Sequence, residues 1–439
     1  MKTVFSFRRL MFETASALHA GSGESDPTQD MPIQLDVNGL PSINATSITG
    51  VLRHLYPVAS EVESLFGSSG DKDGSGSCLL VSDALVLDER QRVVDGLLAS
   101  EPSEYLVRIS QLMRRDHCAL DQSGSARKGG KFDRTVLMAG VRFLVELTVL
   151  GTDTAVARRQ ADTLVKLFAS PWMRLGGGTR DGFGRIQLLK VTGGEYDLAV
   201  SEQREAYLRR PASLAEPTGE PELALPQERP QGMETLHYRL SPEKFWLVSD
   251  GTGLYDLDIR PKREARVVWK DGKPDFPMQV LLPATSVKGA LAHRTAYHHN
   301  ILTERFADRL SKEEREQPNP AVRSLFGYAK GDADAKEGRV GRVMLSDLYL
   351  ESPEPQTFNH VMIDRFTGGA LEGALFTEQV IAGGDFEFEV TILPSEDDLQ
   401  HPEYRQAFDL ALKDLVEGRL PLGGGTMRGL GNMKGGLQA

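Results

Sequence analysis

Two segments of the sequence combine hydroxyl and cationic side chains in a pattern that could bind an anion. INATSITGVLRH contributes Ser47, Thr49 and Arg53, and LPATSVKGALAH with the residue after it contributes Ser286, Lys288 and Arg294. Each segment reads as the start of a helix, where unpaired backbone N–H groups and the helix dipole favour a phosphate. Simple N-capping by Thr46 or Ser47, and by Thr285 or Ser286, is the alternative.

Two glycine-rich stretches, LGGGTRDGFGRI near residue 175 and LGGGTMRGLGNM near residue 422, are the second repeated feature. Each follows a predicted helix and precedes a strand, whereas a dinucleotide-binding turn needs the opposite order, and no GxxxxGK[ST] motif is present. The glycines at 176–178 and 423–425 predict positive φ angles and the close approach of a ligand or a neighbouring backbone. A polyanion is one candidate ligand, and a tight connection without ligand is the alternative. The polyanion would contact Gly177, Gly178, Arg180, Gly424, Gly425 and Arg428.

These stretches belong to a longer internal repeat. INATSITGVLRH is followed by SLFG, LVSDALVL, ARKGGKFDRTVLMAG and FLVELTVL, while LPATSVKGALAH is followed by SLFG, MLSDLYLE, ALEGALFTEQVIAGG and FEFEVTIL. Because the matches keep the same order, we predict a tandem duplication with modules at 1–195 and 234–439. The Pro- and Glu-rich residues 196–233 are predicted to form an extended linker.

Hydrophobic periodicity predicts the same elements in both halves. Strands are expected at 3–18, 79–87, 141–150 and 183–189, and again at 236–248, 343–350 and 386–393. The second helix of each half has apolar residues three and four positions apart, at Ala161, Leu164, Val165 and Phe168, and at Phe408, Ala411, Leu412, Leu415 and Val416. The resulting βαββαβ order is the ferredoxin-like plan, an α+β fold that RNA-recognition motifs also use.

Composition narrows the class of protein. The chain has 439 residues and a net charge of -11, which argues against a protein that coats nucleic acid along its whole surface. Basic residues nevertheless cluster at 105–134 and 260–270, as a phosphate-binding surface or as solvated loops. Two cysteines without a CxxC motif fit a reducing compartment, and no apolar run could span a bilayer. We therefore expect a cytoplasmic protein without membrane contact.

The ensemble of motifs resembles a known family. LPATSVKGAL, SLFG, the strand with SD, VMIDRFTGGALEGALFTEQVIAGGDFEFEV and LPLGGGTMRGLGNM are similar to backbone subunits of type III CRISPR effector complexes in the RAMP superfamily. The first half is similar in INATSITGVLRH, SLFG, SARKGGKFDRTVLMAG and LGGGTRDGFGRI. Two modules in one chain resemble the fused double-backbone subunit of a subtype III-D-like complex.

The resemblance implies partners and contacts. It implies a subunit in antiviral defence that winds along a guide CRISPR RNA, binds complementary target RNA and assembles with other type III effector subunits. Helix starts and glycine-rich loops would contact guide phosphates, and thumb-like hairpins at 108–134 and 361–376 would wedge between guide and target. The hairpin cations implied as contacts are Arg127, Lys128, Lys131 and Arg365.

The resemblance also implies that each module cleaves target RNA with a catalytic aspartate and a divalent ion, for which the family suggests Mg²⁺. In QDMPIQLD of the first half, Asp30 takes the family position and Asp26 is the nearest rival. The second half is longer here, so Asp258, Asp256 and Asp250 all stay open, in that order of preference. Such a carboxylate would position a hydrated metal ion or orient a 2′-hydroxyl.

Two alternatives remain from the sequence. The first is a structural guide-RNA-binding subunit without nuclease activity. The second is a guide-processing nuclease that uses histidine, because His54 and His293 occupy matching positions in the repeat. A repeated histidine on a helix is more often a packing or surface residue.

Overall fold

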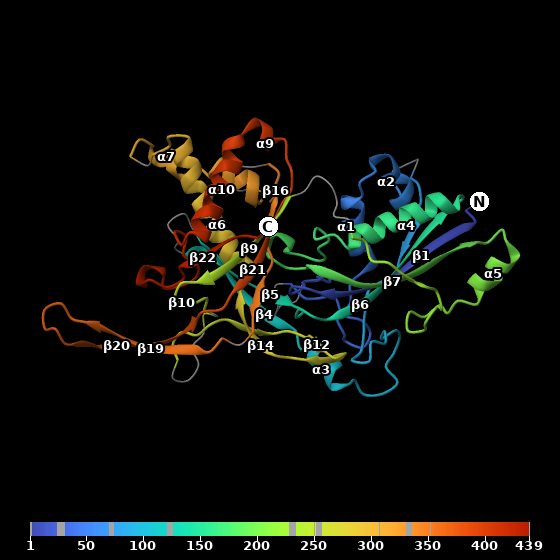
Figure 1. Cartoon of the computed structure of the whole chain (residues 1–439), viewed down its shortest axis with the longest axis horizontal. Helices are drawn as coiled ribbons and strands as arrows, with labels where there is room; N and C mark the ends of the chain where they lie inside the picture. The colour runs from blue at the N-terminus through green and yellow to red at the C-terminus, as the bar shows by residue number, and fades with distance from the viewer. Residues whose placement is uncertain are drawn as a thin grey trace. The chain divides into compact units, whose positions relative to one another are not determined.

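The chain divides into two compact units (Figure 1). The computed structural model describes residues 2–23, 31–69, 74–120, 126–227, 234–249, 251, 257–306, 308–330, 336–351 and 353–438. Unit 1 comprises Met1–Thr179, Phe183–Gln231 and Arg266–Pro277, and unit 2 comprises Arg180–Gly182, Gly232–Ala265 and Met278–Ala439. Each unit combines helices with antiparallel sheets, which confirms the predicted mixture of α and β structure.

Unit 1 is built on one antiparallel sheet with the strand order β2-β6-β1-β7-β8, in which β3 also pairs with β6. Its first strand alternates between a core face, with Leu10 and Phe12, and an outward face, with Phe5 and Phe7. The strands are β1 (Val4–Thr14), β2 (Leu79–Val81), β3 (Leu85–Val86), β6 (Arg142–Gly151), β7 (Ile186–Asp197) and β8 (Glu222–Leu223).

Helices cover the core face of this sheet. The predicted apolar positions of the helix Thr154–Phe168 are buried, and Phe168 packs against Phe12 of β1 at 5.5 Å between ring centres. Asp153 caps this helix by accepting a hydrogen bond from the Val156 N–H. The helical elements of the first half are α1 (Ala45–Leu55), α2 (Ala59–Phe66), α3 (Glu104–Ser110), α4 (Thr154–Phe168) and the short η1 (Thr179–Asp181), whose last two residues belong to unit 2.

The outward face of the same sheet is covered by residues 198–223, which we call the cover segment. It contains α5 (Ser201–Leu208) and β8, which pairs with β7. Tyr207 packs on Phe5 at 4.9 Å, and the Arg210 guanidinium lies 3.5 Å from the centre of the Phe7 ring. Much of the predicted extended linker is therefore an ordered part of unit 1.

Ion pairs also fix the cover segment. Arg9 on β1 donates hydrogen bonds to Glu146 and to the Glu216 carbonyl, at 2.8 and 2.6 Å. Arg210 donates to the same Glu146 at 2.9 Å. Because Arg9 is only 6% exposed, this network lies beneath the segment rather than at its rim.

Unit 2 contains a second sheet with the strand order β17-β21-β9-β22. If strands are matched in chain order, this is the order of β2, β6, β1 and β7 in unit 1. Further short strands pair as β11-β14-β18 and β15-β16. Their bounds are β9 (Glu234–Pro242), β11 (Arg263–Ala265), β14 (Met278–Leu282), β15 (Gly327–Tyr328), β16 (Arg339–Val340), β17 (Val343–Met344), β18 (Leu348–Leu350), β21 (Phe386–Ile392) and β22 (Met433–Leu437). The hairpin β12 (Val268–Lys270) and β13 (Lys273–Asp275) belongs to unit 1.

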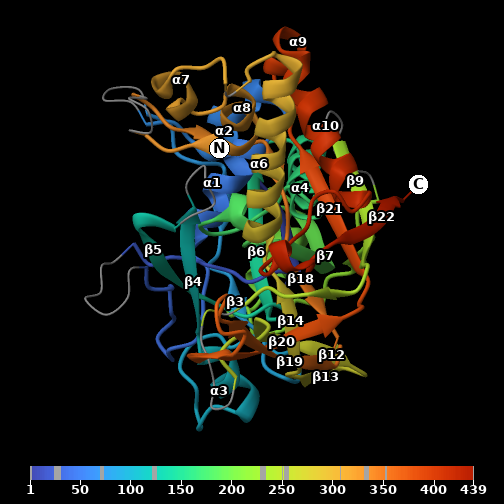
Figure 2. The same cartoon turned by 90° about the vertical axis from the view of Figure 1, so that its left-hand side faces the viewer.

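The helices of unit 2 pack around two long members that lie side by side, α6 and α10 (Figure 2). Phe408, Ala411, Leu412 and Leu415 of α10 are buried in the same core as Leu291 of α6. The helical elements are α6 (Ala284–Leu302), α7 (Lys312–Glu316), α8 (Pro320–Phe326), α9 (Asp397–Gln400), α10 (Pro402–Val416) and η3 (Thr426–Arg428).

A β-hairpin extends from each half where the sequence predicted a thumb. The first consists of β4 (Met113–Leu120) and β5 (Ala126–Val136), and the second of β19 (Pro355–Ile363) and β20 (Ala370–Ala382). The second hairpin projects from the rest of unit 2 (Figure 1), and apolar side chains are exposed at its end. Phe366 at its tip is 96% exposed, and Met362 and Ile363 are 61% and 53% exposed.

The predictions 3–18 and 236–248, for the first strand of each half, were wrong at the C-terminal end for one shared reason. The first strand of each half leaves its sheet early and pairs with the base of the hairpin. In unit 1, β1 ends at Thr14 and Leu18 bridges to Leu137. In unit 2, β10 (Phe245–Trp246) pairs with β20 instead of continuing β9.

Candidate functional site

The loops that follow the first strands of the two halves close in the same register. Gly21 forms an antiparallel bridge with Ile33, and Ser249 forms one with Pro261. Next to each bridge, a backbone hydrogen bond of 2.7 Å is also repeated. The Gln34 N–H donates to the Ala20 carbonyl, and the Lys262 N–H donates to the Val248 carbonyl. The described residues 31–34 therefore correspond to residues 259–262.

The bridges give a reference point for the candidate aspartates in the sequence. Counted back from the bridge, Asp30 lies three residues before Ile33, and Asp258 lies three residues before Pro261. By this count, Asp258 has the same sequence distance from its bridge as Asp30. Asp26, Asp30, Asp250 and Asp256 lie outside the described residues, so the structure gives side-chain surroundings for Asp258 alone among these candidates.

Asp258 is exposed and anchored to the second hairpin. Its Oδ2 accepts a hydrogen bond of 2.7 Å from the Thr377 N–H, and its own N–H donates to the Thr377 carbonyl. Ile259 continues this contact through a parallel bridge to Glu378. Residues 258 and 259 therefore add an edge to β20, and the Asp258 carboxylate is held against Thr377 of the hairpin.

The glycine-rich loops approach the backbone at the end of the first strands. A Cβ built on Gly176 would lie 2.2 Å from the His19 carbonyl oxygen, and one on Gly423 would lie 2.2 Å from the Leu247 carbonyl oxygen. Both glycines have positive φ, 79° and 91°. The repeated glycines are thus required by backbone packing inside each unit, which was the alternative to a ligand.

The central glycines behave differently from the sequence prediction. Gly177 and Gly424 do not have positive φ, and each donates its N–H at 2.7 Å to the carbonyl just described, in its own unit. Gly178 and Gly425 do have positive φ, 68° and 69°. A Cβ on Gly178 would also collide with the Arg134 guanidinium. The prediction of positive φ is therefore correct for the outer glycines and wrong for the central ones.

The helix starts are capped by aspartates that the sequence analysis did not single out. Asp83 accepts from the Ala45 N–H at 2.7 Å, and Asp347 accepts from the Ala284 N–H at 2.9 Å. The N-cap positions are Asn44 and Pro283, so the predicted caps are wrong and lie inside the first turns, at Thr46, Ser47, Thr285 and Ser286. The signal was present, because both aspartates belong to the repeated SD motif.

Of the cations and hydroxyls predicted at these helices, several already have protein partners. Thr49 donates to the Ala45 carbonyl, and Arg53 donates to the Gly67 carbonyl. Lys288 is paired with Asp181 at 3.2 Å, and Arg294 with Asp414 at 2.5 Å. Ser47 is exposed and Ser286 is half-buried.

The two loop arginines are not equivalent. Arg180, part of unit 2, donates from Nε to the Gly341 carbonyl at 2.8 Å, and burial lowers its pKa. It is therefore poorly placed for a phosphate. Arg428 is 45% exposed along its side chain and pairs with the buried Glu378 at 2.6 Å.

The hairpin cations are better placed for an external anion. Lys128 and Lys131 on β5 are exposed, and Arg365 is exposed at the tip of the second hairpin. Asp364 shapes that tip by accepting hydrogen bonds from residues 366 and 367, and the bonds from Thr367 lower its pKa. The Arg127 side chain lies outside the described residues.

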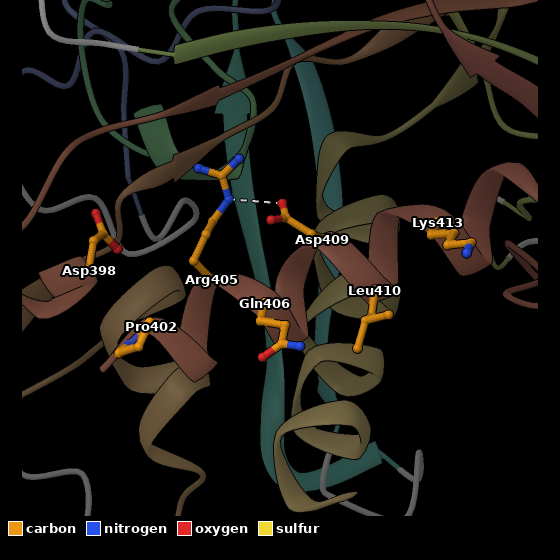
Figure 3. Close-up of a pocket in the computed structure, with 7 residues that line it drawn as sticks. All are labelled: Asp398, Pro402, Arg405, Gln406, Asp409, Leu410 and Lys413. Atoms are coloured by element: carbon orange, nitrogen blue, oxygen red, sulfur yellow. Dashed lines mark hydrogen bonds and ion pairs between the residues drawn. The ribbon is translucent and has the colours of Figure 1, made fainter. Parts of the chain in front are cut away.

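Other features give no catalytic arrangement. His54 and His293 are both exposed on their helices. Among the described residues, no group of three or more His, Cys, Asp or Glu could hold a metal ion, and no helix could cross a membrane. A surface cavity of about 500 Å³ along α10 is lined partly by Arg405, which pairs with Asp409 (Figure 3). Arg405 also pairs with Glu234. These contacts raise the pKa of Arg405, Glu234 being the first cause.

The fold and the site together define a mixed α and β protein in which hairpins flank glycine-rich loops. The family model of the RAMP superfamily matches residues 11–187 and 280–434, so the chain belongs to the RAMP superfamily. Membership indicates a CRISPR-associated subunit. A comparison with curated proteins found no match.

Proposed function

We propose that the chain is a backbone subunit of an RNA-guided type III CRISPR effector complex that binds guide RNA and cleaves complementary target RNA. Its two units would act as ferredoxin-like modules fused in one subunit, as in a III-D-like system, with the hairpins β4–β5 and β19–β20 as thumbs. Its partners would be guide RNA, target RNA and other effector subunits.

The observation that carries the nuclease proposal is the matched register of Asp30 and Asp258. A duplicated loop that keeps a carboxylate at the same distance from its closing bridge is expected if each copy serves the same reaction. The Thr377 N–H orients one oxygen of Asp258 and leaves the other for a ligand. Being exposed, this carboxylate is not needed for the core.

A divalent ion fits such a site. Mg²⁺ is commonly held by one or two carboxylates together with substrate phosphates and water, so Asp258 alone meets the protein's share. When bound, the ion would neutralise charge on the scissile phosphate. Asp258 itself would orient either that ion or the attacking 2′-hydroxyl, a task of placement.

Phosphate binding is assigned to the residues that remain accessible. Lys128, Lys131 and Arg365 on the hairpins are exposed, and Arg428 is half-exposed. We give Arg180 and Lys288 a smaller share, because protein groups already occupy them. Cation contacts of this kind predict guide affinity that falls steeply with salt and varies little with sequence.

The test has two stages. The chain is first purified from its host and examined for co-purified short RNAs of uniform length. The assembled complex is then given a complementary RNA. Asp30→Asn and Asp258→Asn should each abolish one cleavage position without weakening target binding, and chelation of divalent ions should abolish both.

Asp256→Asn is the matched control, because it removes a charge from the same loop outside the register, and it should leave every cut intact. If Asp258→Asn complexes still give all fragments, the second unit is structural. If both aspartate variants cut normally, the subunit binds RNA without cleaving it.

A further inference from the structure

A cleft in unit 2 lies where the base of the β19–β20 hairpin meets the second glycine-rich loop. Its volume is about 330 Å³, within the range of roughly 300–1,000 Å³ found for small-ligand sites. The residues used below are Lys244, Phe245, Phe358, His360, Glu378 and Arg428. Except for Arg428, none of them is among the residues predicted from the sequence to contact RNA.

The cleft walls are aromatic and held in place. Phe245 and Phe358 meet edge to face, with ring centres 5.1 Å apart. His360 stacks on Phe376 across the hairpin at 4.7 Å. Aromatic rings of this kind provide stacking surfaces for an unpaired base.

The charged residues suit a phosphate at the rim. Glu378 is 1% exposed, and its two oxygens accept hydrogen bonds from His360 Nε2 at 2.7 Å and Arg428 Nη2 at 2.6 Å. This buried carboxylate therefore fixes the two side chains, while the remaining N–H groups of Arg428 stay available. Lys244 adds a second cation to the lining.

The first hairpin has the same stacked pair but a different surrounding. His117 stacks on Phe132 at 5.0 Å, as His360 does on Phe376. Arg115 lies two residues before His117, as Phe358 lies two residues before His360. Arg134 lies two residues after Phe132, as Glu378 lies two residues after Phe376.

Arg115 and Arg134 fill the place in unit 1 that corresponds to the cleft of unit 2. Their guanidinium carbons lie 5.0 and 5.2 Å from the centre of the Phe183 ring, and Arg115 is only 4% exposed. The Arg134 guanidinium also lies directly over Gly178. The aromatic walls and the buried carboxylate are thus features of unit 2.

We propose that the cleft of unit 2 holds one unpaired RNA nucleotide, with its base against Phe245 and Phe358 and its phosphate at Lys244 and Arg428. This rests on the proposed RNA-binding function and adds an asymmetry to it. One unit has a nucleotide pocket, and the corresponding place in the other is filled by arginine.

The test uses the full-length chain and an oligouridine RNA that carries one photoreactive thiouridine. Crosslinks mapped by mass spectrometry should fall in peptides with residues 244–245, 358–360 and 428. They should be absent from peptides with residues 115–117 and 134. Phe358→Leu should weaken binding roughly tenfold, as expected for the loss of one base–aromatic stack.

Two matched variants separate the cleft from its surroundings. Phe306→Leu changes the same residue type at an exposed position of unit 2, outside the cleft and the hairpin, and should leave affinity unchanged. Lys244→Ala should reduce the slope of log affinity against log salt by about one phosphate contact, whereas Lys434→Ala should not. Lys244→Ala also serves if Phe358→Leu does not fold.

The two hypotheses fail in different ways. RNA that binds but crosslinks elsewhere, with Phe358→Leu and Lys244→Ala both matching the unmodified chain, overturns the pocket and leaves the proposed function standing. A full-length chain that binds no RNA overturns both.

Discussion

The outward faces of the two sheets differ although their strand orders match. In unit 1 this face carries Phe5 and Phe7, and the cover segment packs over it. In the sheet register, His237 pairs with Glu389 in unit 2 as Arg9 pairs with Glu146 in unit 1. Two residues earlier on the same strands, Thr235 therefore corresponds to Phe7. An aromatic outer face requires a cover to remove it from water, whereas a polar face does not.

Other parts of the two units were kept alike. The glycine-rich loops make the same backbone contacts, and an aspartate from the SD motif caps the first helix in both. The two units therefore share backbone contacts and helix caps, which we call the shared devices, and differ in the side-chain clusters that each unit adds. Changes to the shared devices should affect both units equally, and changes to the individual clusters should affect one unit alone.

The largest effect is expected for Gly176→Val and Gly423→Val. Each adds a side chain at positive φ and 2.2 Å from a carbonyl oxygen, so each unit should lose more than about 3 kcal/mol of stability. Hydrogen-exchange mass spectrometry reads the two units separately. Gly424→Ala is the control and should cost less than about 1 kcal/mol, since its Cβ would meet nothing closer than 3.8 Å. Native protection in Gly423→Val would contradict the shared role.

The next effect concerns Asp414, which belongs to unit 2 alone. Burial raises the pKa of Asp414, but hydrogen bonds from Arg419, His298 and Arg294 outweigh this effect and lower the pKa to about 2. A depressed folded-state pKa gives stability above the ordinary value near 4 that is lost as pH falls toward 2. Asp414→Asn should lower the free energy of unfolding of unit 2 by about 2 kcal/mol at neutral pH. The variant should also lose less stability than the unmodified chain when the pH is lowered from about 4 toward 2. An unchanged acid profile would argue against the network.

A smaller effect is expected from Arg210→Ala, which acts on unit 1. It removes the guanidinium from the Phe7 ring and one ion pair to Glu146, at a cost of about 1–2 kcal/mol. Faster exchange should follow in residues 201–223 and in β1. The neighbouring Arg209→Ala is the control, because its side chain is 78% exposed, and it should change stability by less than about 0.5 kcal/mol. Equal effects of both variants would mean that the cover segment is held by its backbone.

The smallest effect should follow from Asp83→Ala and Asp347→Ala. Each removes the acceptor for the first N–H of α1 or α6 and should cost about 1 kcal/mol, seen as faster exchange in the first turn. Asp83→Asn and Asp347→Asn keep an acceptor and should recover most of the loss. A response in only one unit would show that the repeated SD motif serves different purposes.

The order of the main sheet strands and of the helices α1, α4, α6 and α10 could be predicted because it depends on periodicity, which both halves of the sequence show. The shorter helices and strands between them were not predicted. Strand ends could not be predicted, since β1 and β9 stop where the chain turns to the hairpin base, a contact far away in sequence. The prediction of an extended linker was wrong for residues 198–223 for a related reason. A Pro- and Glu-rich composition predicts an extended chain, but it does not reveal that this segment packs over the rings of Phe5 and Phe7.

The sequence offers the loop aspartates as candidates without ranking those of the second half by structure. The bridge between Ser249 and Pro261 adds that Asp258 has the same sequence distance from its bridge as Asp30 has from Ile33. Spacing also gave no sign that Lys288 would pair with Asp181. Charges that meet in the fold neutralise one another, and sequence distance hides such pairs.

The apolar tip of the second hairpin has a practical consequence for the purified protein. Phe366, Met362 and Ile363 present an adhesive patch, while a net charge of -11 keeps copies apart. Added salt screens the repulsion but leaves the apolar attraction intact. The isolated chain should therefore concentrate best in dilute buffer at a pH well above its isoelectric point of about 5.4, and it should self-associate as ionic strength rises.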